Sequence, residues 1–270
     1  MVLFPNAKIN IGLRIIARRS DGYHDIETVF YPVKLYDALE FVRSESREDE
    51  LVMTGIVIGS DAKENLVSKA VNKLRQKSQF PILKIHLHKA IPAGAGLGGG
   101  SSDATCLLKS LNKYYSLGVS HSDLSDMALG LGSDCPFYIE NQPAYATGRG
   151  EKMETVPDVL EDFHIVLINP GLHVSTKEAY SQCVPSKPDS NLKELIKLPA
   201  EQWKEFIFND FEEYVFRKFP VIGEIKEALY ASGAVFSLMS GSGSSVFGIF
   251  NEKPALPEEL RKLVIYEGEI

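Results

Sequence analysis

The first clear pattern along the chain is an alternation of apolar and polar residues near its start. The apolar positions are Ile9, Ile11, Leu13 and Ile15, and the polar positions between them begin with Lys8 and Asn10. Because side chains alternate between the two faces of a strand, this pattern predicts a half-buried strand with one polar face, shared by Lys8 and Asn10. Further strands are expected at 26–33 and 39–42, followed by a solvated charged loop at 43–50.

A change to helical spacing follows. Apolar residues between 66 and 74 recur as on one face of a helix, and residues 83–87 then return to strand alternation. The polar positions of this second alternation are Lys84, His86 and His88. Since no third ligand stands at a suitable spacing, we interpret the two histidines as surface residues rather than a metal-binding pair.

A glycine-rich run from Pro92 to Ser102 separates this strand from the next helix, whose apolar face is carried by residues 107–111. We expect Ser101, Ser102 and Asp103 to form the first turn of the helix and to cap it. A second helix is expected at 124–131, and a turn then leads into an apolar segment at 137–139.

The second half of the chain has a different order of expected strands and helices. A strand is expected at 165–168, helices between 175 and 232, and strands at 234–239 and 246–250 on either side of Ser240–Ser245. Segregated strands and helices favour an α+β fold over a doubly wound sheet. The expected domains are residues 1–150 and 151–270.

Composition narrows the class of protein. The chain has 270 residues, with 29 basic and 36 acidic side chains and a formal charge of −7. This balance argues against a partner that is a nucleic acid or a membrane surface, so any anion must be bound by a local site. The three cysteines have no metal-site or disulfide-framework spacing, and with no signal-like segment they indicate a cytoplasmic protein.

Gly94, Gly96 and Gly99 match the G-x-G-x-x-G pattern of dinucleotide-binding folds. The match fails in its context, because position 114, about 20 residues further on, is Tyr rather than an acid. A P-loop is also excluded, since position 100 is Gly where that motif requires Lys. A glycine loop that opens a helix still presents backbone N–H groups to an anion, so we favour a phosphate cradle over a merely flexible or tightly packed loop.

A phosphate site without its own lysine needs a cation from elsewhere. Lys8 and Asp134 are the candidates for a charged role at this site. The alternatives are that Lys8 is a solvated lysine on a strand and that Asp134 hydrogen-bonds the backbone of its own turn. Sequence alone does not bring these two residues together. Taken by itself, Ser240–Ser245 is interpreted as a hairpin turn in preference to a second anion-binding nest.

Three segments in this order resemble the motifs of the GHMP kinase superfamily. They are Pro5–Gly12, Pro92–Ala104 and Met239–Ser245, and they span most of the chain. The resemblance implies a two-domain fold, with a ribosomal-protein-S5-like N-terminal domain and a ferredoxin-like C-terminal domain. Asp21–His24, Gly132–Phe137 and Asn169–Gly171 are similar to a branch that uses ATP to phosphorylate the 2-hydroxyl of a cytidine-diphosphate methylerythritol in the non-mevalonate isoprenoid pathway.

The resemblance also implies roles for individual residues. Lys8 and Asp134 match the catalytic pair. The positions that match the ATP site are Asn65, Pro92, Ala93, Gly94, Ala95, Gly96, Leu97, Gly98, Gly99, Gly100, Ser101 and Ser102. The positions that match substrate contacts are Asn10, Tyr23, His24 and Tyr180, with the two tyrosines on opposite faces of the cytosine.

Three readings therefore stay open at this point. The first is a kinase for the cytidine-diphosphate substrate, with ATP and Mg²⁺, and the second is a GHMP kinase for homoserine, mevalonate or a sugar. The third is a nucleotide-binding module without catalysis. A monomer or weak homodimer is expected.

Overall fold

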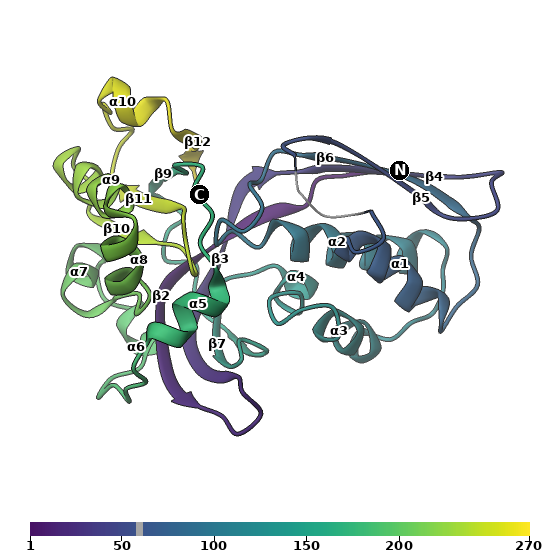
Figure 1. Cartoon of the computed structure of the whole chain (residues 1–270), viewed down its shortest axis with the longest axis horizontal. Coiled ribbons are helices and arrows are strands. Elements are labelled where there is room, and N and C mark those ends of the chain that lie inside the picture. The colour runs from purple at the N-terminus through teal and green to yellow at the C-terminus, as the bar shows by residue number, and fades with distance from the viewer. Residues whose placement is uncertain (58–61) are drawn as a thin grey trace. The chain divides into compact units, whose positions relative to one another are not determined.

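The computed structural model describes residues 1–57 and 62–270, which form two compact units (Figure 1). Both units are discontinuous in sequence. The first unit comprises Met1–Ala7, Leu35–Ala93 and Gly98–Gln142, and the second comprises Lys8–Lys34, Gly94–Leu97 and Pro143–Ile270. The glycine-rich run is therefore divided, with Gly94–Leu97 in the second unit and its flanks in the first.

The first unit is a four-stranded sheet with helices. The strands, in spatial order, are β1 (Val2–Leu3), β4 (Ala38–Arg43), β6 (Leu83–Lys89) and β5 (Glu50–Gly55). β6 pairs antiparallel with β4 and parallel with β5. The helices are α1 (Leu66–Arg75), α2 (Gly99–Tyr114), α3 (His121–Leu129) and α4 (Phe137–Glu140).

The predicted alternation of β6 is confirmed and explains how this unit forms its core. Leu83, Ile85 and Leu87 are buried, whereas the residues between them are exposed. The buried side chains pack in one cluster with apolar residues of α1 and α2, including Val71 and Leu108. The exposed histidines of β6 share a hydrogen bond each with the Thr54 hydroxyl, so they are surface residues as expected.

The second unit contains two four-stranded sheets. One has the order β2 (Asn6–Arg18), β3 (His24–Tyr36), β7 (Ala144–Gly148), β8 (Lys152–Thr155). The other has the order β10 (Phe236–Met239), β11 (Val246–Phe250), β9 (His164–Ile168), β12 (Val264–Glu269), with every neighbouring pair antiparallel.

Several helices belong to this unit and pack against its core. They are α5 (Thr176–Gln182), α6 (Leu192–Leu195), the 3-10 helix η1 (Ala200–Gln202), α7 (Trp203–Phe206), α8 (Glu212–Lys218), α9 (Pro220–Ala231) and α10 (Glu258–Arg261). Leu13 and Ile15 of β2 share a buried cluster with Ile168 of β9 and Ile225 of α9. Residues from the start of the chain therefore help to form the core of a unit that lies mostly after residue 142.

The α+β class is confirmed, and two local expectations need correction. β2 is not half-buried along its polar face, because Lys8 and Asn10 are both buried and hydrogen-bonded. The charged loop is confined to residues 44–49, because Arg43 ends β4 and Glu50 begins β5, a strand that the sequence did not predict. Within the described ranges, no helix is both long and apolar enough to cross a bilayer.

The expected domain boundary differs from the grouping into units. A cut after residue 150 falls between β7 and β8, which pair as a hairpin with Ala146 opposite Met153. It also separates β2 and β3 from the helices with which they share a core. The domains 1–150 and 151–270 therefore stay a prediction.

Candidate functional site

Lys8 is a buried cation in the second unit, next to the glycine-rich run. Its side chain is 3% exposed, and Nζ donates to Asn10 Oδ1 at 2.6 Å and to the Gly96 carbonyl oxygen at 3.1 Å. The ammonium lies 5.1 Å from the centroid of the Phe30 ring. These contacts hold the charge at one place beside the glycine-rich run, so the alternative of a solvated strand lysine is wrong.

Both polar atoms of the Asn10 side-chain amide are hydrogen-bonded. It accepts from Lys8, and Nδ2 donates to the Thr28 hydroxyl at 2.9 Å. Thr28 in turn donates to the Gly12 carbonyl oxygen at 2.6 Å. Asn10 therefore orients Lys8 in this structure, and its assignment as a substrate contact stays a prediction.

The segment Gly94–Leu97 is tied to the rest of the second unit by its carbonyl groups. Ser240 Oγ donates to Gly96 O at 2.9 Å, and the Ser245 backbone N–H donates to Ala95 O at 3.2 Å. Gly96 has φ of +80°, and a Cβ placed on it would lie 1.9 Å from the Ser240 carbonyl oxygen. Only glycine permits this close approach, since any side chain would meet backbone.

Ser240–Ser245 forms the turn of the β10–β11 hairpin, so the hairpin interpretation is confirmed. The Ser240 N–H donates to Ser245 O at 2.9 Å, and Asn209 Nδ2 donates to both Met239 O and Gly241 O at 2.8 Å. The first and third sequence motifs thus meet the middle of the second motif within one unit.

The first unit holds the start of α2. Gly98 is the N-cap residue with φ of +68°, and no side-chain cap is present among the described residues. The expectation that Ser101, Ser102 or Asp103 caps the helix is wrong, because the two serines lie inside the first turn and Asp103 pairs with Lys89. Uncapped first-turn N–H groups leave the positive end of the helix dipole available to an anion.

Two other predicted site segments lie beside this helix end. A Cβ on Gly100 would be 3.8 Å from Leu66, which begins α1, and Asn65 Oδ1 caps α1 by accepting from the Val67 N–H at 2.9 Å. The turn that holds Asp134 is fixed to α2 because Thr105 Oγ1 donates to Cys135 O at 3.1 Å. The structure therefore brings Asn65, Asp134 and the start of α2 into one unit.

The Asp134 carboxylate acts on two buried neighbours, Cys135 and Tyr138. Burial raises the pKa of the Cys135 thiol, with the Asp134 carboxylate adding to the rise. Burial also raises the pKa of Tyr138 well above its usual value, and Asp134 again contributes. Lys8 and Asp134 belong to different units, so their pairing stays a prediction.

The predicted substrate residues other than Asn10 form aromatic contacts in the second unit. The His24 and Tyr180 rings are stacked, with centroids 5.0 Å apart and planes at 22°, and Phe211 meets Tyr180 edge-on at 4.9 Å. Tyr23 is 53% exposed, and the Arg149 guanidinium lies 4.7 Å from its ring centroid. An exposed aromatic ring offers a flat surface on which another planar group can stack.

Sequence reasoning missed two charged features. Arg149 lies in the turn after β7, and only its contact with Tyr23 draws attention to it. Lys89 pairs with Asp37 and Asp103 in the interior of the first unit. A signal for it existed, because Lys89 continues the inward-facing positions 83, 85 and 87 of β6.

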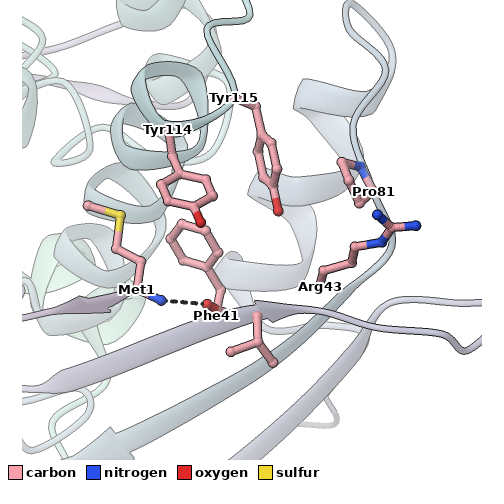
Figure 2. A pocket seen from close by; sticks show the side chains of 7 residues that line it. Met1, Phe41, Arg43, Pro81, Tyr114 and Tyr115 are labelled. Carbon is pink, nitrogen blue, oxygen red and sulfur yellow. Dashed lines mark hydrogen bonds between the residues drawn. The ribbon is translucent and has the colours of Figure 1, made fainter.

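A surface pocket in the first unit shares no residue with the predicted sites (Figure 2). It has a volume of about 310 Å³ and is lined by Met1, Phe41, Val42, Arg43, Pro81, Tyr114 and Tyr115. The Met1 ammonium donates to Phe41 O at 2.9 Å along its edge. In residues 1–57 and 62–270, no group of three or more His, Cys, Asp or Glu side chains could hold a metal ion.

Comparison with known proteins matches both halves of the chain. Residues 65–147 match the GHMP kinases N terminal domain, and residues 190–266 match the GHMP kinases C terminal domain. A 4-diphosphocytidyl-2-C-methyl-D-erythritol kinase of Parabacteroides distasonis is 50% identical over the whole of both chains. The Bacteroides fragilis protein of the same name is 48% identical, over 96% of this chain and 93% of its own.

Solved structures agree with these matches. A crystal structure of 4-(cytidine 5'-diphospho)-2C-methyl-D-erythritol kinase has a TM-score of 0.80 and 32% identity, covering 99% of this chain and 98% of its own. A homoserine kinase from Cytophaga hutchinsonii has a TM-score of 0.58 at 16% identity, over 96% and 88% of the two chains. The second likeness concerns the fold alone.

Proposed function

The chain belongs to the GHMP kinases, in the family of 4-diphosphocytidyl-2-C-methyl-D-erythritol kinases, and on this basis we propose its reaction. The protein transfers the γ-phosphoryl group of ATP to the 2-hydroxyl of 4-diphosphocytidyl-2-C-methyl-D-erythritol, giving the 2-phosphate and ADP. The observation that carries the proposal is the 50% identity to such a kinase along the entire chain.

ATP binding is assigned to Asn65 and to the run Pro92–Ser102. The support is local: the first turn of α2 has no side-chain cap in the described structure, and the helix dipole concentrates positive potential at its N–H groups. Gly98, with its positive φ, turns the backbone into the helix. Mg²⁺ enters with the nucleotide, because this ion is commonly held by substrate phosphates and only one or two carboxylates.

Phosphoryl transfer depends on positioning and charge neutralisation more than on covalent chemistry by the protein. In the proposed step the Asp134 carboxylate accepts the proton of the substrate hydroxyl as its oxygen attacks the γ-phosphorus, and the bond from that phosphorus to the ADP oxygen breaks. The Lys8 ammonium neutralises charge that develops on the transferring group. Its bonds to Asn10 and Gly96 support this role, since a preorganised cation needs no reorganisation during transfer.

Recognition of the cytidine end is assigned to Tyr23, His24 and Tyr180. Tyr23 is exposed and lies against Arg149, which leaves ring surface for a base to stack on. His24 is held by stacking on Tyr180 and can present a ring nitrogen to the edge of cytosine. Arg149 adds positive charge next to Tyr23, which suits an anionic substrate.

The protein is also proposed to be cytoplasmic and a monomer or weak homodimer. The charge of −7 supports small-molecule partners rather than nucleic acid or membrane. Light scattering during gel filtration at several protein concentrations would test the oligomeric state.

ADP release measured with several acceptors tests the proposed function directly. The purified protein is supplied with Mg·ATP and either the cytidine-diphosphate methylerythritol, homoserine, mevalonate or no acceptor, and the product is identified by mass and ³¹P NMR. We expect stoichiometric ADP and a monophosphorylated product with the first acceptor alone. Turnover only with homoserine or mevalonate would favour another GHMP kinase, and ATP binding without turnover would favour a nucleotide-binding module.

A further inference from the structure

Three charged side chains meet in the interior of the first unit. Lys89 is 3% exposed, and Asp37 and Asp103 are each 1% exposed. The Lys89 ammonium donates to Asp37 Oδ2 and, at 2.7 Å, to Asp103 Oδ2. Burial of ionised groups is costly unless each is paired, so the three side chains depend on one another to stay buried in this unit.

The two carboxylates are not equally well bonded. Asp37 Oδ1 accepts from the backbone N–H groups of Ala90 at 2.6 Å and Ile91 at 2.9 Å, so both of its oxygens are engaged. Asp103 Oδ1 is buried and has no hydrogen-bond partner in the described part of the chain. Burial, aided by the nearby Asp37, raises the pKa of Asp103 to about 7, against the opposing effect of Lys89.

The triad lies directly behind the first turn of α2. Lys89 ends β6, Asp37 holds the N–H groups of the next two residues, and Asp103 belongs to α2. A Cβ on Gly99 would lie 3.3 Å from Lys89 Nζ and 2.8 Å from Ile91. The triad therefore joins the strand before the glycine-rich run to the helix after it, with its charge adjacent to the first-turn N–H groups.

We propose that the Asp37–Lys89–Asp103 triad is the positioning device of the phosphate site, and that gain of one proton by Asp103 tightens nucleotide binding. With both carboxylates ionised the triad carries −1 behind the helix end and opposes the phosphates. With Asp103 protonated it is neutral, and the helix dipole acts on the phosphates unopposed. This inference rests on the proposed function, which places ATP phosphates at the start of α2.

Linkage gives the proposal a measurable consequence. If protonation of Asp103 favours phosphate binding, phosphate binding must favour protonation of Asp103 by the same factor. Nucleotide binding near pH 7 is therefore accompanied by net uptake of a fraction of a proton from solvent.

Other titratable groups around Asp103 do not change charge over the same range. Cys106, also on α2, has its thiol pKa raised by burial, and the pKa of Tyr138 on α4 is raised much further. Both stay neutral at pH 6 to 8. Lys89 and Asp37 are the charged groups that act on Asp103. On Tyr138, the carboxylates of Asp134, Asp103 and Asp37 act together.

The test is binding of the non-hydrolysable analogue AMP-PNP with Mg²⁺, measured by calorimetry between pH 6.0 and 8.5. Wild type should lose about 10-fold more affinity over this range than Asp103→Asn, which holds the triad neutral at every pH. The γ-phosphate also titrates, and comparing the two proteins cancels its effect. Asp126→Asn, an exposed aspartate of α3, is the matched control and should follow wild type.

A second measurement counts the protons taken up on binding. Binding enthalpies of wild type at pH 7 in buffers of different ionisation enthalpy report the number of protons taken up, which we expect to be positive and to fall toward zero in Asp103→Asn. In steady-state kinetics the variant should change the KM for ATP and its pH dependence, with little change in kcat. Lys89→Arg keeps a cation between the carboxylates and should preserve the KM for ATP and its pH dependence. Lys89→Met removes the cation and should not preserve them.

Three outcomes would overturn the inference. Parallel pH profiles for wild type and Asp103→Asn would remove the triad from nucleotide binding while leaving the kinase function standing, as would zero proton uptake by wild type. Absence of any nucleotide binding or ADP release by wild type would overturn the proposed function and this inference with it.

Discussion

Asp134 is the residue on which the proposed chemistry depends most directly. Replacement by Asn keeps the size of the side chain and removes its capacity to accept a proton, so Asp134→Asn should lower kcat by about 100- to 10,000-fold. The affinity for AMP-PNP should stay within about twofold, because binding of the phosphates is assigned to α2 and not to this carboxylate. Steady-state kinetics and calorimetry on the same preparation check both statements.

Asp126→Asn again provides the control, since Asp126 is exposed on α3 and outside every proposed contact. Near-normal turnover of Asp134→Asn would exclude Asp134 as the base. An equal loss of nucleotide affinity would instead point to a structural role for its turn.

Gly96 tests the close approach between the glycine-rich run and Ser240. An added methyl group would meet the Ser240 carbonyl oxygen at 1.9 Å on a backbone with φ of +80°, so Gly96→Ala combines backbone strain with overpacking. We expect a loss of about 2 to 5 kcal/mol in the free energy of unfolding. Gly233→Ala is the matched control, because φ there is +95° with nothing within 4 Å, and it should cost about 1 to 2 kcal/mol. Urea denaturation of the two variants measures the difference, and equal losses would show that the contact is unimportant.

At the scale of elements, Asn65 has a structural role that competes with its assignment to adenine. Its side chain caps α1, and a serine can cap equally well while lacking the amide. Asn65→Ser should therefore keep the stability of the protein, whereas Asn65→Ala should lose about 1 kcal/mol. If the amide also bonds the nucleotide, both variants should raise the KM for ATP by about 2- to 12-fold. A normal KM in Asn65→Ser would leave Asn65 as a helix cap alone.

Local patterns predicted the elements whose signal lies within a few residues. The alternation at 83–87 and the helical spacing at 66–74 correspond to β6 and α1, and the glycine-rich run does lead into α2. β5 alternates only between exposed and half-buried positions, and its first residue, Glu50, fell within the predicted charged loop, so no strand was predicted there. Its strand is fixed by parallel pairing with β6, which no local pattern can reveal.

The candidate site shows the same division between local and distant causes. Lys8 and Asn10 were expected on one face, and their side chains are indeed bonded to each other. Their burial depends on Gly96 and Ser240, which are 88 and 230 residues away along the chain from Lys8 and Asn10 respectively. The pairing of Lys89 with Asp37 likewise spans 52 residues. Local periodicity does not predict contacts between residues so far apart along the chain, so the buried polar contacts of both units are seen only in the structure.

At the scale of the whole molecule, an acidic chain is proposed to bind two anionic small molecules. The charge of −7 describes the average surface, whereas the cations relevant to function are placed locally. Lys8 is buried beside Gly96, Arg149 lies over Tyr23, and the start of α2 contributes N–H groups that no count of charged side chains includes. Binding of small anions is therefore compatible with a surface that repels polyanions.

The division of the chain into folding units gives the last prediction. Leu13, Ile15 and Ile26 belong to the buried cluster of the second unit, with residues of β9, β11 and α9. A fragment of residues 151–270 lacks all three, and burying such side chains contributes roughly 5 to 9 kcal/mol in total, which is comparable to the stability of a typical domain. We therefore expect the isolated fragment to show no cooperative thermal transition by circular dichroism.

Co-expression of residues 1–150 with residues 151–270 provides the control. If the contacts of β2 and β3 are what the fragment lacks, the two pieces should copurify and regain a cooperative transition, because β7 and β8 can pair again across the cut. A cooperative transition of the fragment alone would instead establish residues 151–270 as an independent domain, as the sequence predicts. Since the isolated half would then fold without β2, the buried position of Lys8 would depend on docking between halves rather than on a shared core.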